Sequence, residues 1–149
     1  MIRYDKEELK QESMPVITME EGRALIKRLK AEAKKHKGCV GLAAPQIGEL
    51  KKVFIVDAGD GFKGYINPQI IDYSIKKDSQ LEGCVSFPGL KVNMLRSLEI
   101  IVLYNEPTTG ELVDKVISGW EARIFQHEYD HLLGVTIDDS LERMLHELV

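Results

Sequence analysis

The sequence predicts an α+β fold, in which short, mostly antiparallel strands pack around a central helix and a second helix lies near the N-terminus. Residues 18–38 and 118–134 both have apolar residues at helical spacing and recognisable helix ends. Between them, short apolar runs are separated by glycine-containing turns, as in antiparallel strands. Strands framed by helices, rather than alternating with them, are typical of α+β proteins.

The N-terminal helix is predicted between Thr18 and Gly38. Thr18 and Glu21 have the spacing of a capping box, and Gly38 can close the helix after a lysine-rich last turn. Basic residues in the stretch 27–37 alternate with Leu29, Ala31 and Ala33, as in an amphipathic helix. We interpret them as a solvated face, with weak contact to ribosomal RNA as the alternative.

Four apolar runs are predicted to form strands: 53–56, 65–71, 98–104 and 112–117. The last two are expected to pair through the turn at 105–110. There are no repeats, low-complexity linkers or apolar stretches long enough to cross a membrane.

The length of 149 residues predicts one domain covering the whole chain, 1–149. The net charge of −4 argues against a dedicated nucleic-acid surface, so neither DNA nor a membrane is expected as a partner. Cys39 and Cys84 are expected to be reduced, because no export signal appears. We expect a monomer in a reducing, cytoplasmic compartment.

The second helix contains the most informative pattern of the chain, His127-Glu128-Tyr129-Asp130-His131. Side chains four residues apart lie on the same side of a helix, so both imidazoles can bind one divalent metal. The adjacent carboxylate is close enough to take a proton from a metal-bound water. This pattern predicts a hydrolase site.

The ends of this helix are predicted as well. Ser118 and Glu121 have the spacing of a second capping box, and Gly134 can take the left-handed conformation that closes a helix. Trp120 and Ile124 have the same helical spacing as the histidines, so the metal is expected to lie against the core.

A third metal ligand has to come from elsewhere in the chain. Cys84 lies in a glycine-containing segment, 82–86, and a thiolate is a strong ligand for zinc or iron. Alternatively, Cys84 is an ordinary buried cysteine or forms a disulfide with Cys39. The weaker ligand candidates all lie in the tail after the helix: Asp138, Asp139, Glu142, His146 and Glu147.

A third segment, residues 41–46 (Gly-Leu-Ala-Ala-Pro-Gln), follows the N-terminal helix. Its small residues allow close backbone approach, and the Gln46 amide could donate a hydrogen bond to a developing oxyanion. Loops of small residues more often have a packing role, so this segment indicates a functional site only in combination with the segments that contain Cys84 and the two histidines.

The three segments 41–46, 82–86 and 126–131 resemble, in sequence and in order, the signature segments of the peptide deformylases. The resemblance covers roughly residues 15–141. Cys39 stands where the family usually has glycine, and Val85 where it usually has leucine; the two ends of the chain also differ from the usual pattern. The departures leave all presumed ligands in place and leave open a divergent subclass, such as an organellar or viral member.

The resemblance implies that Cys84, His127 and His131 bind a divalent metal, with a water in the fourth position. Family members commonly use Fe²⁺ and also accept Zn²⁺, Ni²⁺ or Co²⁺, and the donor set suits several of these ions. The implied substrate is the N-formyl-methionine end of a newly synthesised polypeptide, which loses its formyl group as formate. The implied compartment is a bacterial or viral-host cytoplasm, or an organelle.

The resemblance also assigns Glu128 as general base and then acid. Gln46 and the backbone N–H of Val85 would meet the charge that develops on the formyl oxygen.

Substrate contacts are expected from three further residues. Gly41 allows close approach of the substrate, and Trp120 and Ile124 are placed to form a methionine pocket, with Arg123 near its rim. Ordinary core packing is the alternative for Trp120 and Ile124.

Two other functions remain open from the residues alone. A metallopeptidase could use the same helix to cut internal amide bonds. A non-catalytic module with a structural metal would usually have four protein ligands, and only three are found here. A blue-copper site does not fit, because such sites are not built from a helical histidine pair with a carboxylate between.

Overall fold

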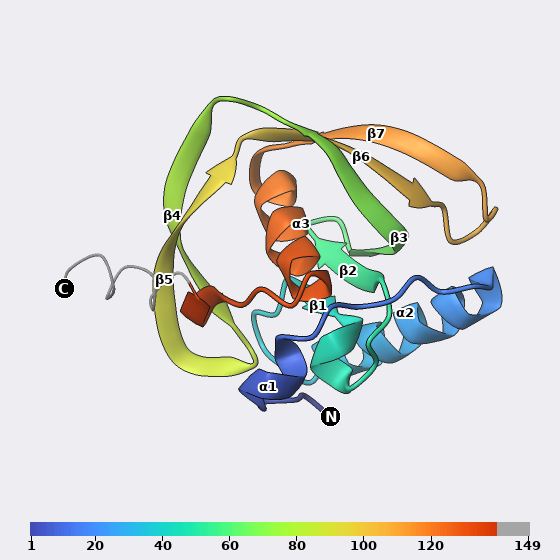
Figure 1. The fold of residues 1–149 in the computed structure, drawn as a ribbon, viewed down its shortest axis with the longest axis horizontal. Helices are drawn as coiled ribbons and strands as arrows, with labels where there is room; N and C mark the ends of the chain where they lie inside the picture. The colour runs from blue at the N-terminus through green and yellow to red at the C-terminus, as the bar shows by residue number, and fades with distance from the viewer. Residues whose placement is uncertain (140–149) are drawn as a thin grey trace.

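The computed structural model describes residues 1–139 and has the predicted α+β architecture (Figure 1). Two longer helices and two short helical segments accompany the strands. In chain order the elements are α1 (Lys6–Leu9), α2 (Met19–Ala33), β1 (Gly41–Ala43), the 3-10 helix η1 (Ala44–Ile47), β2 (Val53–Asp57), β3 (Phe62–Tyr73), β4 (Lys77–Cys84), β5 (Phe87–Ser97), β6 (Glu99–Asn105), β7 (Leu112–Ser118) and α3 (Gly119–Leu132).

The strands form two separate sheets. Five of them are hydrogen-bonded in the order β1-β2-β3-β6-β7, and every neighbouring pair is antiparallel. β4 and β5 form a two-stranded hairpin of their own. Helix α3 lies at the centre of the molecule, between the larger sheet and the hairpin (Figure 1).

The four apolar runs are confirmed as β2, β3, β6 and β7, although β3 and β5, with 12 and 11 residues, are longer than the short strands expected. The β4–β5 hairpin is absent from the sequence prediction. β4 has the sequence KDSQLEGC, and half of its residues are exposed. A strand with so few apolar residues lacks the alternation by which strands are recognised.

Helix α2 begins as predicted but ends early. The Thr18 hydroxyl accepts a hydrogen bond from the backbone N–H of Glu21 at 3.2 Å, which is the expected N-cap contact. The helix ends at Ala33 rather than near Gly38, because the chain continues in tighter turns, such as the bond from the His36 N–H to the Ala33 carbonyl. Within the lysine-rich stretch, Ala31 is exposed, contrary to the amphipathic pattern.

Helix α3 has the expected bounds but not the expected N-terminal cap. Ser118 occupies the N-cap position, yet its side chain makes no capping hydrogen bond, so the predicted capping box is wrong. The Glu121 carboxylate instead accepts a hydrogen bond from the Tyr65 hydroxyl at 3.2 Å. At the other end, Gly134 has a φ of +75° and its N–H bonds the His131 carbonyl, as expected for a C-terminal glycine.

An aromatic cluster fixes α3 against the larger sheet. The ring of Phe125 lies 4.8 Å from that of Phe54 and 5.0 Å from that of Tyr65, both with edge-to-face geometry. All three side chains are fully buried. This packing holds one face of the helix and turns the histidine face towards the hairpin. Within residues 1–139, no helix is long and apolar enough to span a membrane.

Candidate metal centre and active site

Helix α3 presents both histidines on one face, as their spacing predicts. The ring centroids of His127 and His131 are 5.3 Å apart. His131 is buried, whereas His127 faces a cavity. The helix thus provides two imidazoles that can approach a single ion.

Cys84 reaches the same place from the hairpin. It is the last residue of β4, immediately before the two-residue turn Val85-Ser86, and its Sγ lies 3.4 Å from Nε2 of His131. Sγ of Cys84 and one nitrogen from each of His127 and His131 all lie within 4.8 Å of one another. A tetrahedral ion with metal–ligand bonds of about 2.0–2.3 Å needs only slightly closer spacing. The donor set therefore fits a divalent metal.

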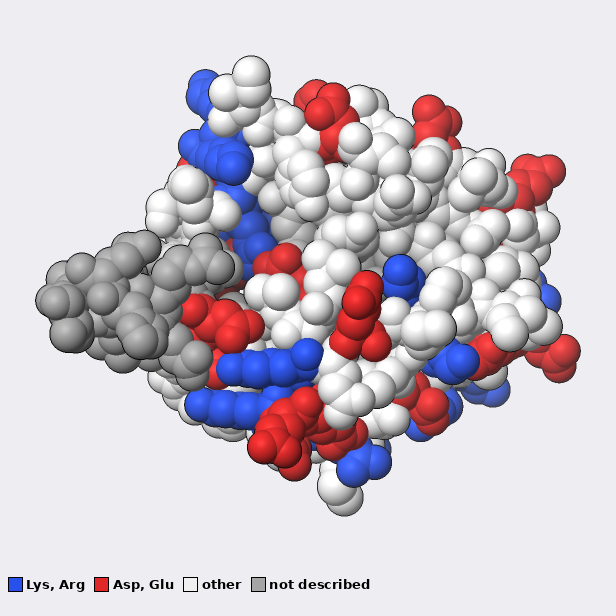
Figure 2. Space-filling model, viewed as in Figure 1, with Lys and Arg blue, Asp and Glu red and all other residues white. Residues whose placement is uncertain are grey.

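The alternatives for a third ligand are engaged elsewhere. Asp138 and Asp139 form ion pairs with Lys10 at 3.2 and 3.0 Å, and Figure 2 shows basic and acidic side chains side by side in the lower part of the molecule. Glu142, His146 and Glu147 lie outside the described residues.

The two cysteines do not form a disulfide. The Cys39 thiol donates a hydrogen bond to the Gly41 carbonyl at 3.2 Å, and burial raises the pKa of Cys39 to about 11. Cys39 is therefore a neutral thiol in the wall of the site.

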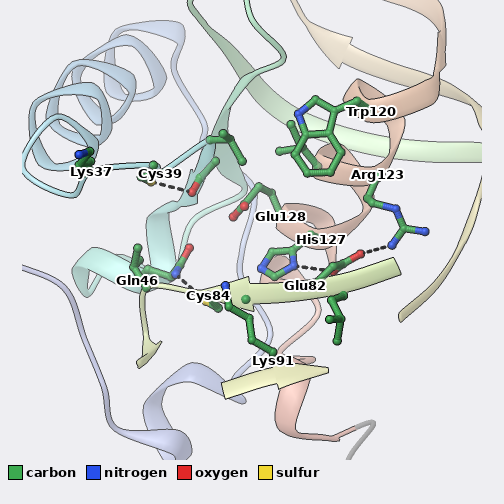
Figure 3. A pocket seen from close by; sticks show the side chains of 17 residues that line it. Lys37, Cys39, Gln46, Glu82, Cys84, Lys91, Trp120, Arg123, His127 and Glu128 are labelled. Carbon is green, nitrogen blue, oxygen red and sulfur yellow. Dashed lines mark hydrogen bonds and ion pairs between the residues drawn. The ribbon is translucent and has the colours of Figure 1, made fainter. Parts of the chain in front are cut away.

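Glu128 is the buried carboxylate of the site. Its side chain points into the cavity (Figure 3), and Oε1 has no hydrogen-bond partner within residues 1–139. Burial raises the pKa of Glu128 to about 7. A carboxylate that titrates near neutral pH, with one oxygen unpaired, is well suited to accept and return a proton.

Gly41 lies directly against Glu128. A Cβ atom at position 41 would be 2.5 Å from Oε2 of Glu128 and 2.9 Å from Cγ2 of Ile124. Only glycine leaves room for the carboxylate in its observed position. The small residues of this segment were expected to allow a close backbone approach, and at Gly41 the group that approaches the backbone is the Glu128 carboxylate.

The Gln46 side chain is held in one orientation by three hydrogen bonds. Its carbonyl oxygen accepts from the Ala43 N–H at 3.0 Å, and its amide nitrogen donates to Cys84 Sγ at 3.3 Å and to the Ser86 hydroxyl at 3.1 Å. The amide N–H groups therefore face the hairpin that carries Cys84. Val85 follows the cysteine and lines the same cavity.

Glu82 contacts the ring of His127, a role that the sequence pattern did not reveal. Its Oε1 is 2.8 Å from Nδ1 of His127, which leaves Nε2 of His127 for the metal. Arg96 bonds both oxygens of Glu82, at 2.9 and 3.1 Å, and also contacts Asp130 on α3 at 2.5 Å. This buried network links the hairpin to the helix.

The protonation states of the site follow from these contacts. Burial acts to raise the pKa of Glu82, but hydrogen bonds from His127 and Arg96 outweigh it and lower the pKa to about 2. Burial acts to lower the pKa of His127, but its hydrogen bonds with Cys84 and Glu82 raise the pKa to about 10. Burial lowers the pKa of His131 well below its usual value. A metal that binds His127 therefore has to displace a proton from its ring.

Arg123 lies in the wall of the cavity, near the rim position that was expected. It borders the cavity, but its guanidinium is buried and forms ion pairs with Glu82 at 2.5 Å and Asp78 at 2.9 Å. The sequence of β5 contains a signal that could have indicated this network. Buried and exposed residues alternate along the strand, and Arg96 lies on the buried face together with Met94. A charged residue on the buried face of a strand requires a partner.

A cavity of about 410 Å³ opens beside these groups (Figure 3). Ile124 is 4% exposed and lines its inner wall, whereas Trp120 is 51% exposed and lies at its edge. Core packing is therefore ruled out for Trp120. The volume is within the range of roughly 300–1,000 Å³ that is typical of ligand-binding pockets.

The chain is similar in sequence and in structure to known proteins over most of its length. The sequence is 45% identical over 106 residues to a peptide deformylase of Thermotoga petrophila, covering 71% of this chain and 64% of that relative. The crystal structure of peptide deformylase from Thermotoga maritima superposes with a TM-score of 0.87 at 38% identity, covering 93% of this chain and 95% of that one. A peptide deformylase from Acinetobacter baumannii, solved with Met-Ala-Ser bound, has a TM-score of 0.85 at 28% identity, covering 93% and 96%.

The sequence model of the polypeptide deformylases matches residues 1–146, which is nearly the whole chain. Cys84, His127 and His131 form one group of possible metal donors, and Glu128 lines the adjoining cavity. The match to the sequence model shows that the chain belongs to the polypeptide deformylase family.

Proposed function

We propose that this protein hydrolyses the N-formyl group of formyl-methionyl ends on newly synthesised polypeptides and releases formate. Family membership supports this reaction, and the neighbour solved with Met-Ala-Ser supports a peptide beginning with methionine as the product. The observation that carries the proposal is the buried carboxylate of Glu128, whose Oε1 has no hydrogen-bond partner among the described residues, beside three convergent metal donors at the edge of a cavity.

Cys84, His127 and His131 hold the metal in this proposal. Fe²⁺ is the proposed native ion, with Zn²⁺, Ni²⁺ and Co²⁺ as substitutes, because two imidazoles and one thiolate accommodate several first-row ions. When bound, the metal supplies Lewis acidity, which lowers the pKa of a coordinated water to about 7.

Glu128 moves the proton. It accepts a proton from the attacking water as the new C–O bond forms at the formyl carbon. It then returns the proton to the amide nitrogen as the C–N bond breaks, so that formate and the free amine leave together. Its burial and its pKa of about 7 suit both steps near neutral pH.

The remaining roles concern substrate position and charge. The Gln46 amide and the backbone N–H of Val85 would donate to the formyl oxygen as negative charge develops on it. Trp120 and Ile124 form the wall against which the methionine side chain would pack, because an unbranched thioether adapts to such apolar surfaces. Gly41 would allow the substrate backbone to approach.

We further propose that residues 1–149 act as a single catalytic domain and as a monomer, without a DNA or membrane partner. The site of action would be where formylated chains are made, in a bacterial or viral-host cytoplasm or in an organelle. The lysine-rich face of residues 27–37 could make weak contact with the ribosome.

A formate-release assay on a formylated Met-Ala-Ser peptide tests the proposed reaction, with the protein purified anaerobically and its metal content measured. Glu128→Ala should abolish turnover while leaving metal content near normal. Glu121→Ala, on the same helix but outside the cavity, is the matched control and should remain active. Turnover only of unformylated peptides would favour a metallopeptidase instead, and retained activity in Glu128→Ala would refute the assigned base.

A further inference from the structure

Two lysines line the cavity at its outer part. Lys37 lies in the turn after α2, and Lys91 lies on β5, and both side chains are exposed. Figure 3 shows Lys37 on the side of the cavity opposite Arg123, with Gln46 and Cys84 between the two lysines in that view. A peptide with its formyl group at the metal donors can therefore meet an ammonium group as it leaves the cavity.

Neither lysine is neutralised within the part of the chain that the structure describes. No carboxylate oxygen of residues 1–139 lies within 4.0 Å of Nζ of Lys37 or Lys91 among the recorded ion pairs. Arg123, another cation in the cavity wall, is already paired with Glu82 and Asp78. Within residues 1–139, Lys37 and Lys91 are thus the lysine and arginine side chains of the cavity wall that have no recorded ion pair.

The position of Lys91 relative to the reaction centre is well defined. A Cβ atom at Gly83 would lie 2.6 Å from Nζ of Lys91 and 3.2 Å from its Cδ, so the lysine side chain lies across the backbone next to Cys84. Gly83 leaves room for this arrangement. The ammonium group is consequently held beside the strand that carries a metal donor, although its side chain is exposed.

We propose that Lys37 and Lys91 form a carboxylate-binding subsite for the residues that follow formyl-methionine. The enzyme then prefers substrates with aspartate or glutamate at the second and third positions. This inference rests on the proposed deformylase function and adds a substrate preference to it. The free C-terminal carboxylate of a short peptide has the same chemistry and can occupy the same subsite.

The expected effect is modest because the lysines are solvated. Exposed ion pairs change binding by roughly two- to five-fold each. The contact is remote from the reacting carbonyl and equally strong before and during the reaction, so it lowers KM and leaves kcat unchanged. High salt weakens it.

Formyl-Met-X-X peptides with an amidated C-terminus measure this preference, where X is glutamate, glutamine or lysine. At low salt we expect kcat/KM to decrease in that order, because KM increases while kcat stays the same. At high salt the differences in kcat/KM should be smaller. The glutamine peptide with a free C-terminal carboxylate tests whether that group can occupy the subsite. Its kcat/KM should be higher than that of the amidated form. Equal kcat/KM for all three amidated peptides would overturn the subsite.

Charge reversal assigns the preference to the two lysines. Lys37→Glu together with Lys91→Glu should reverse the order, so that the lysine peptide becomes the best substrate, and Lys37→Arg with Lys91→Arg should keep the original order. Lys27→Glu with Lys76→Glu makes the same change in net charge on exposed residues that do not line this cavity, and it should also keep the original order.

The outcomes separate the subsite from the reaction. An unchanged order in the double reversal, or the same reversal in the control pair, would overturn the subsite while turnover of the glutamine peptide still supports deformylation. Failure to hydrolyse any formylated peptide would overturn the proposed function and the subsite with it.

Discussion

The proposed active site is assembled from two regions of unlike character, the face of helix α3 and the β4–β5 hairpin. On the helix, His127, Glu128 and His131 lie within little more than one turn, so helix geometry alone fixes their relation. The hairpin brings Cys84 and Glu82 to the same point through tertiary packing. The helical residues of the site can therefore be recognised from local sequence spacing. The hairpin adds the third metal donor and orients His127.

The contacts between the two regions explain how the hairpin orients the helix. Glu82 bonds the ring of His127, and Arg96 joins Glu82 to Asp130. A substitution of Glu82 or Arg96 on the hairpin should therefore change the orientation of His127, although the helix itself is not mutated.

The largest effect is expected from the single ligand of the hairpin. Cys84→Ala removes the thiolate that completes the donor set, so bound metal and turnover should both be lost. Metal analysis and formate release measure this together. Cys39→Ala is the matched control, because Cys39 lies in the same cavity but outside the donor group, and it should retain its metal. Equal metal loss in both variants would contradict the assignment.

Glu82→Gln should be the next most damaging change. It leaves the buried Arg96 and Arg123 without their shared carboxylate, at a cost of about 3–5 kcal/mol in the free energy of unfolding. The metal should bind about 10–100-fold more weakly, because His127 loses its partner. Asp78→Asn is the control: Asp78 also pairs with Arg123 but is 41% exposed and does not contact His127.

Acid unfolding sharpens this comparison. The folded pKa of Glu82 is about 2, below its ordinary value of 4.5, so its ionised form stabilises the fold above that ordinary value. The contribution should disappear as the pH falls from about 4.5 to about 2. Glu82→Gln should therefore show a smaller loss of stability over this range than the wild type. An identical acid dependence in the two proteins would contradict the ion-paired state of Glu82.

Gly41→Ala should have a smaller effect, confined to catalysis. The new Cβ would lie 2.5 Å from the Glu128 carboxylate and displace it, and a displacement of this kind can lower kcat by about 10–100-fold with the metal retained. Gly83→Ala is the control, since its Cβ meets only the flexible end of Lys91 and should change kcat for an uncharged peptide less than about five-fold. Similar kcat values for both variants would argue against a role for Glu128 position.

The smallest effects concern the two helix N-termini. Thr18→Ala removes an observed capping hydrogen bond and should lower the free energy of unfolding by about 1 kcal/mol. Ser118→Ala removes a side chain that makes no capping bond, so a change within about 0.5 kcal/mol is expected. Thermal or urea unfolding measures both. A larger loss for Ser118→Ala would mean that its side chain does cap α3 in solution.

The same contrast explains what the sequence could predict. The His127–His131 pattern, the N-cap at Thr18 and the four apolar strands depend on spacing along the chain, and all were recognisable. The β4–β5 hairpin was missed because β4 is mostly polar, and Glu82 had no assigned role because its partners, Arg96 and His127, are distant in sequence. Cys84 became a ligand candidate through thiolate chemistry, and family resemblance then placed it with the histidines.

X-ray absorption at the edge of the bound metal tests the central claim most directly, namely that the helix and the hairpin share one ion with a position left for solvent. The account predicts one sulfur and two imidazole nitrogens in the first shell, with a light atom in the remaining position, and loss of the sulfur contribution in Cys84→Ser. A shell without sulfur in the unmodified protein, or one filled by four protein ligands, would contradict it.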